Sequence, residues 1–238
     1  MKQKYRLTDE TITHNGVTLY RIEALRDFGY VTSGDKGGFV QSELNLSQEG
    51  DCWIYDEAEV YGKAEVCGEA RVYGEARVYG KAKVYDKAEV GCKAMVCGKA
   101  KVYGKACVSG EARVYGKARV YDKACVSGEA EVYDKAEVGC KAMVCGKAKV
   151  SNKAMVCGEA GIGCNAVIKS IQDYIVFKNW WSSGRYFTWT RSNNMWKVGC
   201  FYGTGEELIT KAYADSEESG KEYERVVRYV ASILASQI

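Results

Sequence analysis

A strict six-residue alternation of apolar and polar positions runs through the middle of the chain, from Cys52 to about Ile168. Alanine occupies every sixth position from Ala58 to Ala166, and an aliphatic residue stands two positions after each alanine. Residues two apart on a β-strand point to the same face, so each Ala-x-Val segment predicts a short strand with both side chains inward. Neither a heptad nor a 3.6-residue period fits the pattern, so the repeat predicts strands and not helices.

The remaining positions of the repeat predict corners and an outer surface. A small or polar residue recurs two positions after each valine, as at Gly62, Asp86, Gly104 and Asn152. Gly, Asp and Asn suit a corner, where a positive φ is needed. Stacked coils would bury a continuous Val/Ala core that no single coil could bury alone. The pattern therefore predicts a parallel β-solenoid.

An aliphatic residue at one position and a small residue four positions later resembles the hexapeptide-repeat proteins. This resemblance implies a mainly β fold, a left-handed parallel β-helix with three hexads per coil. That family usually carries Gly, Ala or an acid directly after the aliphatic residue, whereas this chain mostly has Tyr, Cys or Ser there. A flatter, two-sided solenoid is therefore the alternative.

The segments on either side of the repeats predict two further units. Residues 1–51 are expected to form an N-terminal cap, with strands over 4–8, 11–14 and 17–22 and a hairpin turn at Asn15-Gly16. We expect the β-helix to span 52–169 and a C-terminal α+β domain to span 170–238. In that domain, the pattern predicts a three-stranded meander over 173–178, 185–191 and 195–201, a capping box at Thr204–Glu207 and two helices, the second from Ser216.

A longer duplication lies within the repeats. The segment Tyr85–Val102 recurs word for word at Tyr133–Val150, eight hexads later. Eight is not a multiple of three, so in a three-sided helix the two copies must lie on different faces. A functional stripe along one face would be scrambled by that offset. We therefore expect the solenoid walls to be scaffold and the function to lie elsewhere.

The composition of the chain argues against nucleic acid, membranes and metals as binding partners of this protein. Lys and Arg total 34 against 31 acidic residues, a net charge of only +3, and no basic face for nucleic acid is apparent. No stretch is long and apolar enough for a membrane span, and no signal peptide opens the chain, so a cytoplasmic location is expected. The chain has 11 Cys but a single His, His14, so reduced structural thiols are expected, with no metal and no cofactor.

Catalysis is not predicted. Many hexapeptide-repeat proteins are acyltransferases, which the resemblance links to a His base inside the coils. The repeats here contain no His, which also excludes the three-His zinc site of the related β-helical carbonic anhydrases. No hexad is interrupted by a protruding loop that could shape an acyl-donor site. We therefore expect a protein that is not an enzyme.

The C-terminal domain concentrates the aromatic residues of the chain. Aromatic faces beside arginines suit stacking on a base and pairing with a phosphate. The candidate ligand-binding residues are Trp180, Trp181, Arg185, Arg191 and Asn193. The alternative interpretation is that most of these aromatics form the core of a small domain. Trp180 and Trp181, in a turn before Ser182-Ser183-Gly184, are the pair expected to be exposed.

Motifs at both ends resemble uncharacterised hexapeptide-repeat proteins of phages and prophages. These motifs are Leu19–Gly29, Gly37–Val40, Glu49–Trp53 and Gly199–Thr204. The resemblance implies a homo-oligomer, with a trimer expected, in the host cytoplasm. The favoured interpretation is a non-catalytic binding protein that sequesters an anionic, nucleotide-like defence signal or binds a host protein. A self-assembling scaffold and an acyltransferase are the alternatives.

Overall fold

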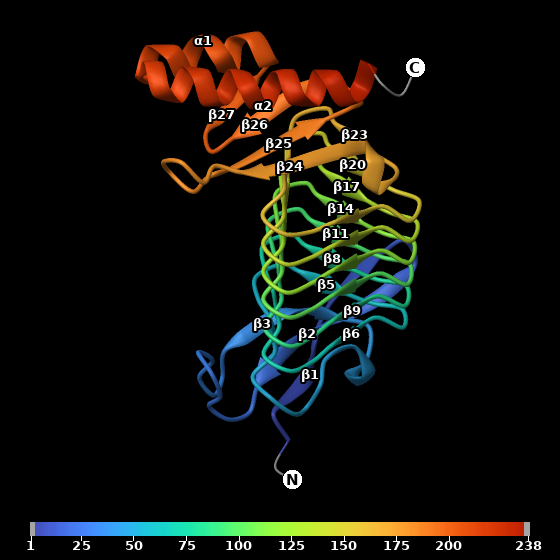
Figure 1. Ribbon diagram of the computed structural model, residues 1–238. Coiled ribbons are helices and arrows are strands. Elements are labelled where there is room, and N and C mark those ends of the chain that lie inside the picture. The colour runs from blue at the N-terminus through green and yellow to red at the C-terminus, as the bar shows by residue number, and fades with distance from the viewer. Residues whose placement is uncertain (1–2, 236–238) are drawn as a thin grey trace.

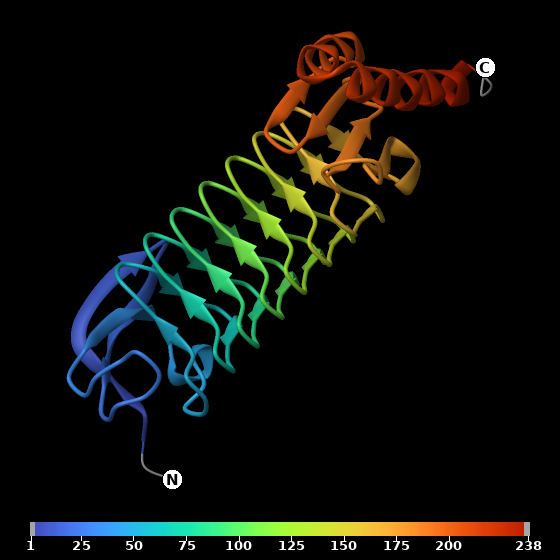
Figure 2. The same cartoon turned by 60° about the vertical axis from the view of Figure 1, so that its left-hand side comes forward.

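Apolar hexad positions form one continuous core along the molecule. The computed structural model describes residues 3–235. Every hexad alanine from Ala58 to Ala166 is buried, as is every valine or isoleucine two positions after it. The residue between the alanine and the valine or isoleucine of each hexad points outward. Figures 1 and 2 show the coils stacked at regular intervals between the N-terminal and C-terminal units.

The solenoid has three faces, each a parallel sheet of two-residue strands. The seven-stranded face holds β4 (Trp53–Ile54), β7 (Arg71–Val72), β10 (Glu89–Val90), β13 (Cys107–Val108), β16 (Cys125–Val126), β19 (Met143–Val144) and β22 (Gly161–Ile162). The ten-stranded face holds β5 (Glu59–Val60), β8 (Arg77–Val78), β11 (Met95–Val96), β14 (Arg113–Val114), β17 (Glu131–Val132), β20 (Lys149–Val150) and β23 (Val167–Ile168), together with β1 (Tyr5–His14), β2 (Val17–Ala24) and β3 (Lys36–Val40) of the N-terminal unit. The six-stranded face holds β6 (Glu65–Val66), β9 (Lys83–Val84), β12 (Lys101–Val102), β15 (Arg119–Val120), β18 (Glu137–Val138) and β21 (Met155–Val156).

Strand register confirms three hexads per coil. Val60 pairs with Val78, and the same eighteen-residue step recurs on each face. A two-sided solenoid is therefore excluded. The duplicated segments do lie on different faces, because Glu89 belongs to the seven-stranded face and its copy Glu137 to the six-stranded face.

Corners of the coils use the left-handed backbone region. Gly62 has φ 69° and Asp86 has φ 59°, as predicted for the position two after valine. The Asp86 carboxylate also accepts a hydrogen bond from the amide of Gly104 in the next coil, at 3.1 Å. Aspartate at a corner thus stabilises both its own turn and the one stacked upon it.

The N-terminal unit extends the ten-stranded face beyond the first coil. Strands β1 (Tyr5–His14) and β2 (Val17–Ala24) form a hairpin whose turn has positive φ at Asn15 and Gly16. Strand β3 (Lys36–Val40) pairs with β2 and then, in parallel, with β5 of the solenoid. The two short strands expected over 4–14 are one strand with an irregularity between Leu7 and Thr11. A short 3-10 helix, η1 (Glu43–Asn45), follows.

The C-terminal unit covers the other end of the solenoid. After a 3-10 turn, η2 (Ile171–Asp173), an antiparallel sheet runs β24 (Tyr174–Lys178), β25 (Tyr186–Thr190), β26 (Met195–Val198) and β27 (Phe201–Gly203). It has four strands and not the predicted three, because Gly199 at φ 55° turns the chain inside the last expected strand. Helices α1 (Gly205–Asp215) and α2 (Glu217–Ala235) lie across the sheet, on the side away from the solenoid (Figure 1).

The C-terminal sheet is hydrogen-bonded to the last coils of the solenoid. The Thr188 hydroxyl accepts a hydrogen bond of 2.9 Å from the amide of Gly161. Phe187, Trp189 and Trp196 are buried in a second hydrophobic core, shared with Leu208 of α1 and Val230 of α2. Most tail aromatics are therefore core residues. No helix within residues 3–235 has the length and apolar character needed to cross a membrane.

Candidate functional site

The only histidine of the chain lies on the solenoid surface, at the end of the N-terminal hairpin. His14 is the last residue of β1, and the Asn15-Gly16 turn places it over the start of the ten-stranded face. Its Nδ1 lies 3.3 Å from Oε2 of Glu59 in β5, and its ring contacts the ring of Tyr61 with centroids 5.7 Å apart. A segment outside the repeats thus supplies a histidine to a repeat carboxylate.

Glu59 is held in an unusual setting for a surface carboxylate. Its side chain is only 13% exposed, and Oε2 accepts no hydrogen bond from any described residue. The cationic Nε of Arg77, on the next coil, lies 3.9 Å from the same oxygen. The contact brings an imidazole and a carboxylate within 3.3 Å of each other, without a hydrogen bond between them. These are the residue types of a general base and of the group that orients it.

A shallow hollow lies further along the same face, and neither His14 nor Glu59 lines it. It has a volume of about 300 Å³, and Arg77 belongs both to the hollow and to the Glu59 contact. Its lining comprises Glu75, Arg77, Lys93, Met95, Glu111 and Arg113. Three cationic side chains against two carboxylates make this a suitable place for an anionic group.

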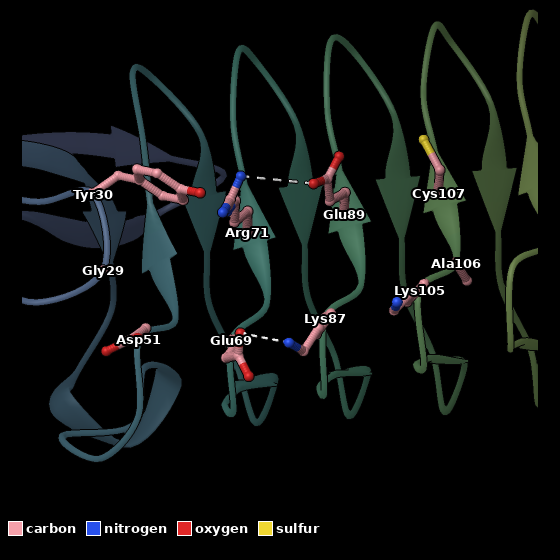
Figure 3. Close-up of a pocket in the computed structure, with 10 residues that line it drawn as sticks. All are labelled: Gly29, Tyr30, Asp51, Glu69, Arg71, Lys87, Glu89, Lys105, Ala106 and Cys107. Carbon is pink, nitrogen blue, oxygen red and sulfur yellow. Dashed lines mark ion pairs between the residues drawn. The ribbon is translucent and has the colours of Figure 1, made fainter.

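A larger hollow lies on the seven-stranded face, beside the N-terminal loop (Figure 3). Its volume is about 720 Å³, and Tyr30 overlies the Arg71 guanidinium at 4.7 Å. Its charged side chains largely pair with each other, since Arg71 lies 3.8 Å from Glu89 and Lys87 lies 3.1 Å from Glu69. The hollow has room for a ligand but brings no histidine to it.

The expected exposed tryptophan pair is split between surface and core. Trp180 is 81% exposed. Trp181 packs on Phe187 and Tyr223, and its Nε1 is buried without a hydrogen-bond partner among the described residues. The two rings meet edge to face at 6.1 Å.

The other predicted site residues lie at opposite ends of β25. Arg185 precedes the strand and lines two small hollows of about 210 and 120 Å³. Arg191 follows the strand, roughly 20 Å further along by strand geometry. Asn193 is engaged in the next turn, where it accepts from the Thr190 hydroxyl at 2.6 Å and donates to the Tyr202 hydroxyl at 2.9 Å. The structure therefore does not gather the five residues into one small site.

The His14–Glu59 pair was not expected from the sequence, because the repeats contain no histidine and residues 1–51 were expected to form only a cap. The available signal was the Asn15-Gly16 turn directly after the single His, which indicates a hairpin tip able to reach a neighbouring surface.

The comparisons with known proteins give a partial match to a protein named as an acetyltransferase. No family model matches the chain. Over 63 residues it is 41% identical to an Escherichia coli K12 protein named "Uncharacterized acetyltransferase YdcK", covering 23% of this chain and 19% of that protein. The chain thus spans less than a fifth of the length of this relative.

This similarity overturns the prediction that the protein is not an enzyme, because a relative named as an acetyltransferase points to enzyme activity. The prediction weighed only the repeats, and the folded N-terminal unit brings a histidine onto them. Repeat register and sequence match together support a hexapeptide-repeat β-helix protein with partial similarity to a named acetyltransferase.

Proposed function

We propose that the protein is an acyltransferase that moves an acyl group from an anionic thioester such as acetyl-CoA to an amine or hydroxyl acceptor. The His14–Glu59 contact at 3.3 Å is the observation that carries the proposal. The partial match to a protein named as an acetyltransferase supports it independently.

His14 is the general base in this proposal. Its Nε2 removes the proton from the acceptor as the acceptor attacks the thioester carbonyl carbon. The tetrahedral intermediate then expels the thiolate, which takes the proton back from the imidazolium. Glu59 holds the ring in position and stabilises its positive charge while the proton resides on it.

The cationic hollow beside the pair would hold the phosphates of the donor. Arg77, Lys93 and Arg113 come from three successive coils of the ten-stranded face and its corner. Loss of one charge-assisted hydrogen bond to a phosphate costs about 1.5–3 kcal/mol. We expect Arg113→Ala to raise the KM for the donor by roughly tenfold or more, with little change in kcat.

The test is acetyl transfer from acetyl-CoA to a panel of amines and sugars, followed by mass spectrometry of the products. His14→Gln should reduce kcat/KM by about 10²- to 10⁴-fold, the usual contribution of a general base. Thr13→Ala, one residue earlier on the same strand, is the matched control, and its kcat/KM should equal that of the wild-type protein. Turnover that survives His14→Gln would overturn the assignment of the base.

We further propose that the C-terminal unit recognises an anionic acceptor or a partner protein. The supporting observations are the exposed Trp180, its contact with Trp181, and Arg185 in two adjoining hollows. This role would be supported if the affinity for the anionic acceptor or partner protein falls at least tenfold in Trp180→Ala or Arg185→Ala, but not in Arg191→Ala. A phage setting and a trimeric assembly stay predictions.

A further inference from the structure

Two cysteines face each other on adjacent coils of the seven-stranded face. Cys107 in β13 and Cys125 in β16 are direct register partners. Both side chains belong to the outward row and are half-buried. The two thiols interact, which raises the pKa of Cys107 and lowers that of Cys125. Since neighbouring strands lie about 4.8 Å apart, the two sulfur atoms are within reach of a bond between them.

This pairing is specific to these two residues. One coil contains eighteen residues, and no other two cysteines of the sequence are eighteen apart. Cys97, by contrast, occupies the row between Tyr79 and Tyr115, and its interaction with the Tyr79 hydroxyl raises the pKa of Tyr79. The remaining thiols therefore lack a stacked thiol partner in the neighbouring coil.

We propose that Cys107 and Cys125 form a redox-active dithiol, which low-molecular-weight disulfides such as glutathione disulfide oxidise to a disulfide between two coils. This site is separate from the proposed acyl-transfer site, which lies on the ten-stranded face. It adds a covalent modification to the solenoid wall, which the repeat pattern alone assigns to scaffold.

The reaction proceeds by two thiol–disulfide exchanges. The Cys125 thiolate attacks one sulfur of glutathione disulfide, forms a mixed disulfide and releases one glutathione thiolate, which takes up a proton. Cys107 then loses its proton and attacks the Cys125 sulfur, releasing the second glutathione. In sum, the protein loses two hydrogens and one glutathione disulfide becomes two thiols.

The roles of the two thiols follow from their contact. The interaction with Cys107 lowers the pKa of Cys125 to about 7, so that much of it is thiolate near neutral pH. The same interaction, together with burial, raises the pKa of Cys107. Cys125 is therefore the attacking residue and Cys107 the resolving one.

The fold makes the bridge reversible. Strands about 4.8 Å apart match the Cα separation of disulfides, but stacked Cβ atoms at that spacing exceed the usual mean of about 3.8 Å. Closing the bond must pull the two outward rows together locally, and strained, exposed disulfides are the easily reduced ones. Cys107 also lines the hollow beside Tyr30 (Figure 3), so oxidation would alter that wall.

The experiment treats the full-length protein with glutathione disulfide at pH 7.5 and analyses a non-reducing tryptic digest by mass spectrometry. The expected product links peptide 106–113 to peptide 124–135, two hydrogens below the summed masses, and dithiothreitol reverses it. Exposed cysteines such as Cys92 and Cys200 should give only slower, unlinked glutathione adducts.

Variants separate the two roles. Cys107→Ser should stop at a mixed disulfide on Cys125, whereas Cys125→Ser should slow modification of Cys107 by about tenfold. The matched control Cys97→Ser should form the link at the wild-type rate. Absence of the linked peptides, or modification of Cys125 no faster than that of Cys92, would overturn the proposal.

Discussion

The ring of Tyr73 lies against the backbone of Gly91 in the next coil, so closely that a Cβ on Gly91 would clash with a ring carbon. Tyr121 lies over Gly139 in the same way. In both hexads the glycine comes one position early, and the positive-φ corner falls to a cysteine, Cys92 or Cys140. At other hexads a tyrosine stacks on a tyrosine in the next coil, as Tyr61 does on Tyr79, so at Gly91 and Gly139 the ring fills the space that the missing side chain leaves.

Cys92→Gly should stabilise the protein. Cys92 has φ 59°, where a side chain costs roughly 1–2 kcal/mol, partly offset by the greater backbone freedom of glycine when unfolded. We expect a net gain of about 0.5–1 kcal/mol, measured as a higher midpoint of urea denaturation. Cys97→Gly, at a position without positive φ, should lower the midpoint, and a lowered midpoint for Cys92→Gly would contradict the argument.

Ala112→Glu should prevent folding or cause aggregation. Ala112 is fully buried in a dry core, where an unpaired carboxylate costs several kcal/mol. The measurement is the soluble yield with circular dichroism of any soluble fraction. Arg113→Glu places the same side chain one residue later, on the outer surface, and should fold normally. A soluble Ala112→Glu protein with unchanged melting would refute an inward Ala row.

The Glu207 carboxylate should make stability depend on pH in the acid range. Hydrogen bonds from the Thr204 amide and hydroxyl hold the pKa of Glu207 below its ordinary value of 4.5. The folded state therefore binds its proton less readily than the unfolded state, and the stabilisation, present above pH 4.5, is lost as the pH falls through the lowered pKa.

Melting temperatures between pH 6 and pH 3 test this linkage. The wild-type protein should lose more stability than Glu207→Gln over that range, because only the wild type has a carboxylate to protonate at this helix start. Glu206→Gln, in the same first turn but outside the capping box, is the control. Equal slopes for wild type and Glu207→Gln would disprove the linkage.

Lys4→Met should destabilise the N-terminal end of the solenoid. Lys4 is fully buried, and its ammonium donates to the carbonyl of Cys52 at 3.0 Å and to that of Gly50 at 3.3 Å. Removing these bonds leaves buried acceptors unsatisfied, at a cost of about 1–3 kcal/mol. Thermal unfolding should show the loss, while Lys36→Met, which changes an exposed lysine, should be nearly neutral.

The repeating strands and corners could be predicted from the sequence, whereas contacts between distant segments could not. Ala and Val spacing is a strict local pattern, and it predicts the strands, the corners and, through the family resemblance, three hexads per coil. The capping box at Thr204 and Glu207 is equally local, and the structure confirms it. His14 meets Glu59 only because the hairpin folds back onto the first coils.

The C-terminal unit was likewise only partly predictable from the sequence. Gly199 breaks the last predicted strand through a turn that composition alone did not indicate. Trp181 is half-buried because α2 brings Tyr223 against it, a contact between segments far apart in the chain. Alternation along a strand cannot tell which face a later helix will cover.

Three hexads complete one coil, so each hexad turns the chain through a third of a revolution about the long axis. Losing or gaining the eight-hexad duplication would therefore change more than the length of the rod. It would swing the C-terminal sheet and helices around the axis by a third of a circle relative to the hairpin that carries His14. The number of repeats therefore sets the angle between the two terminal units about the long axis as well as the distance between them.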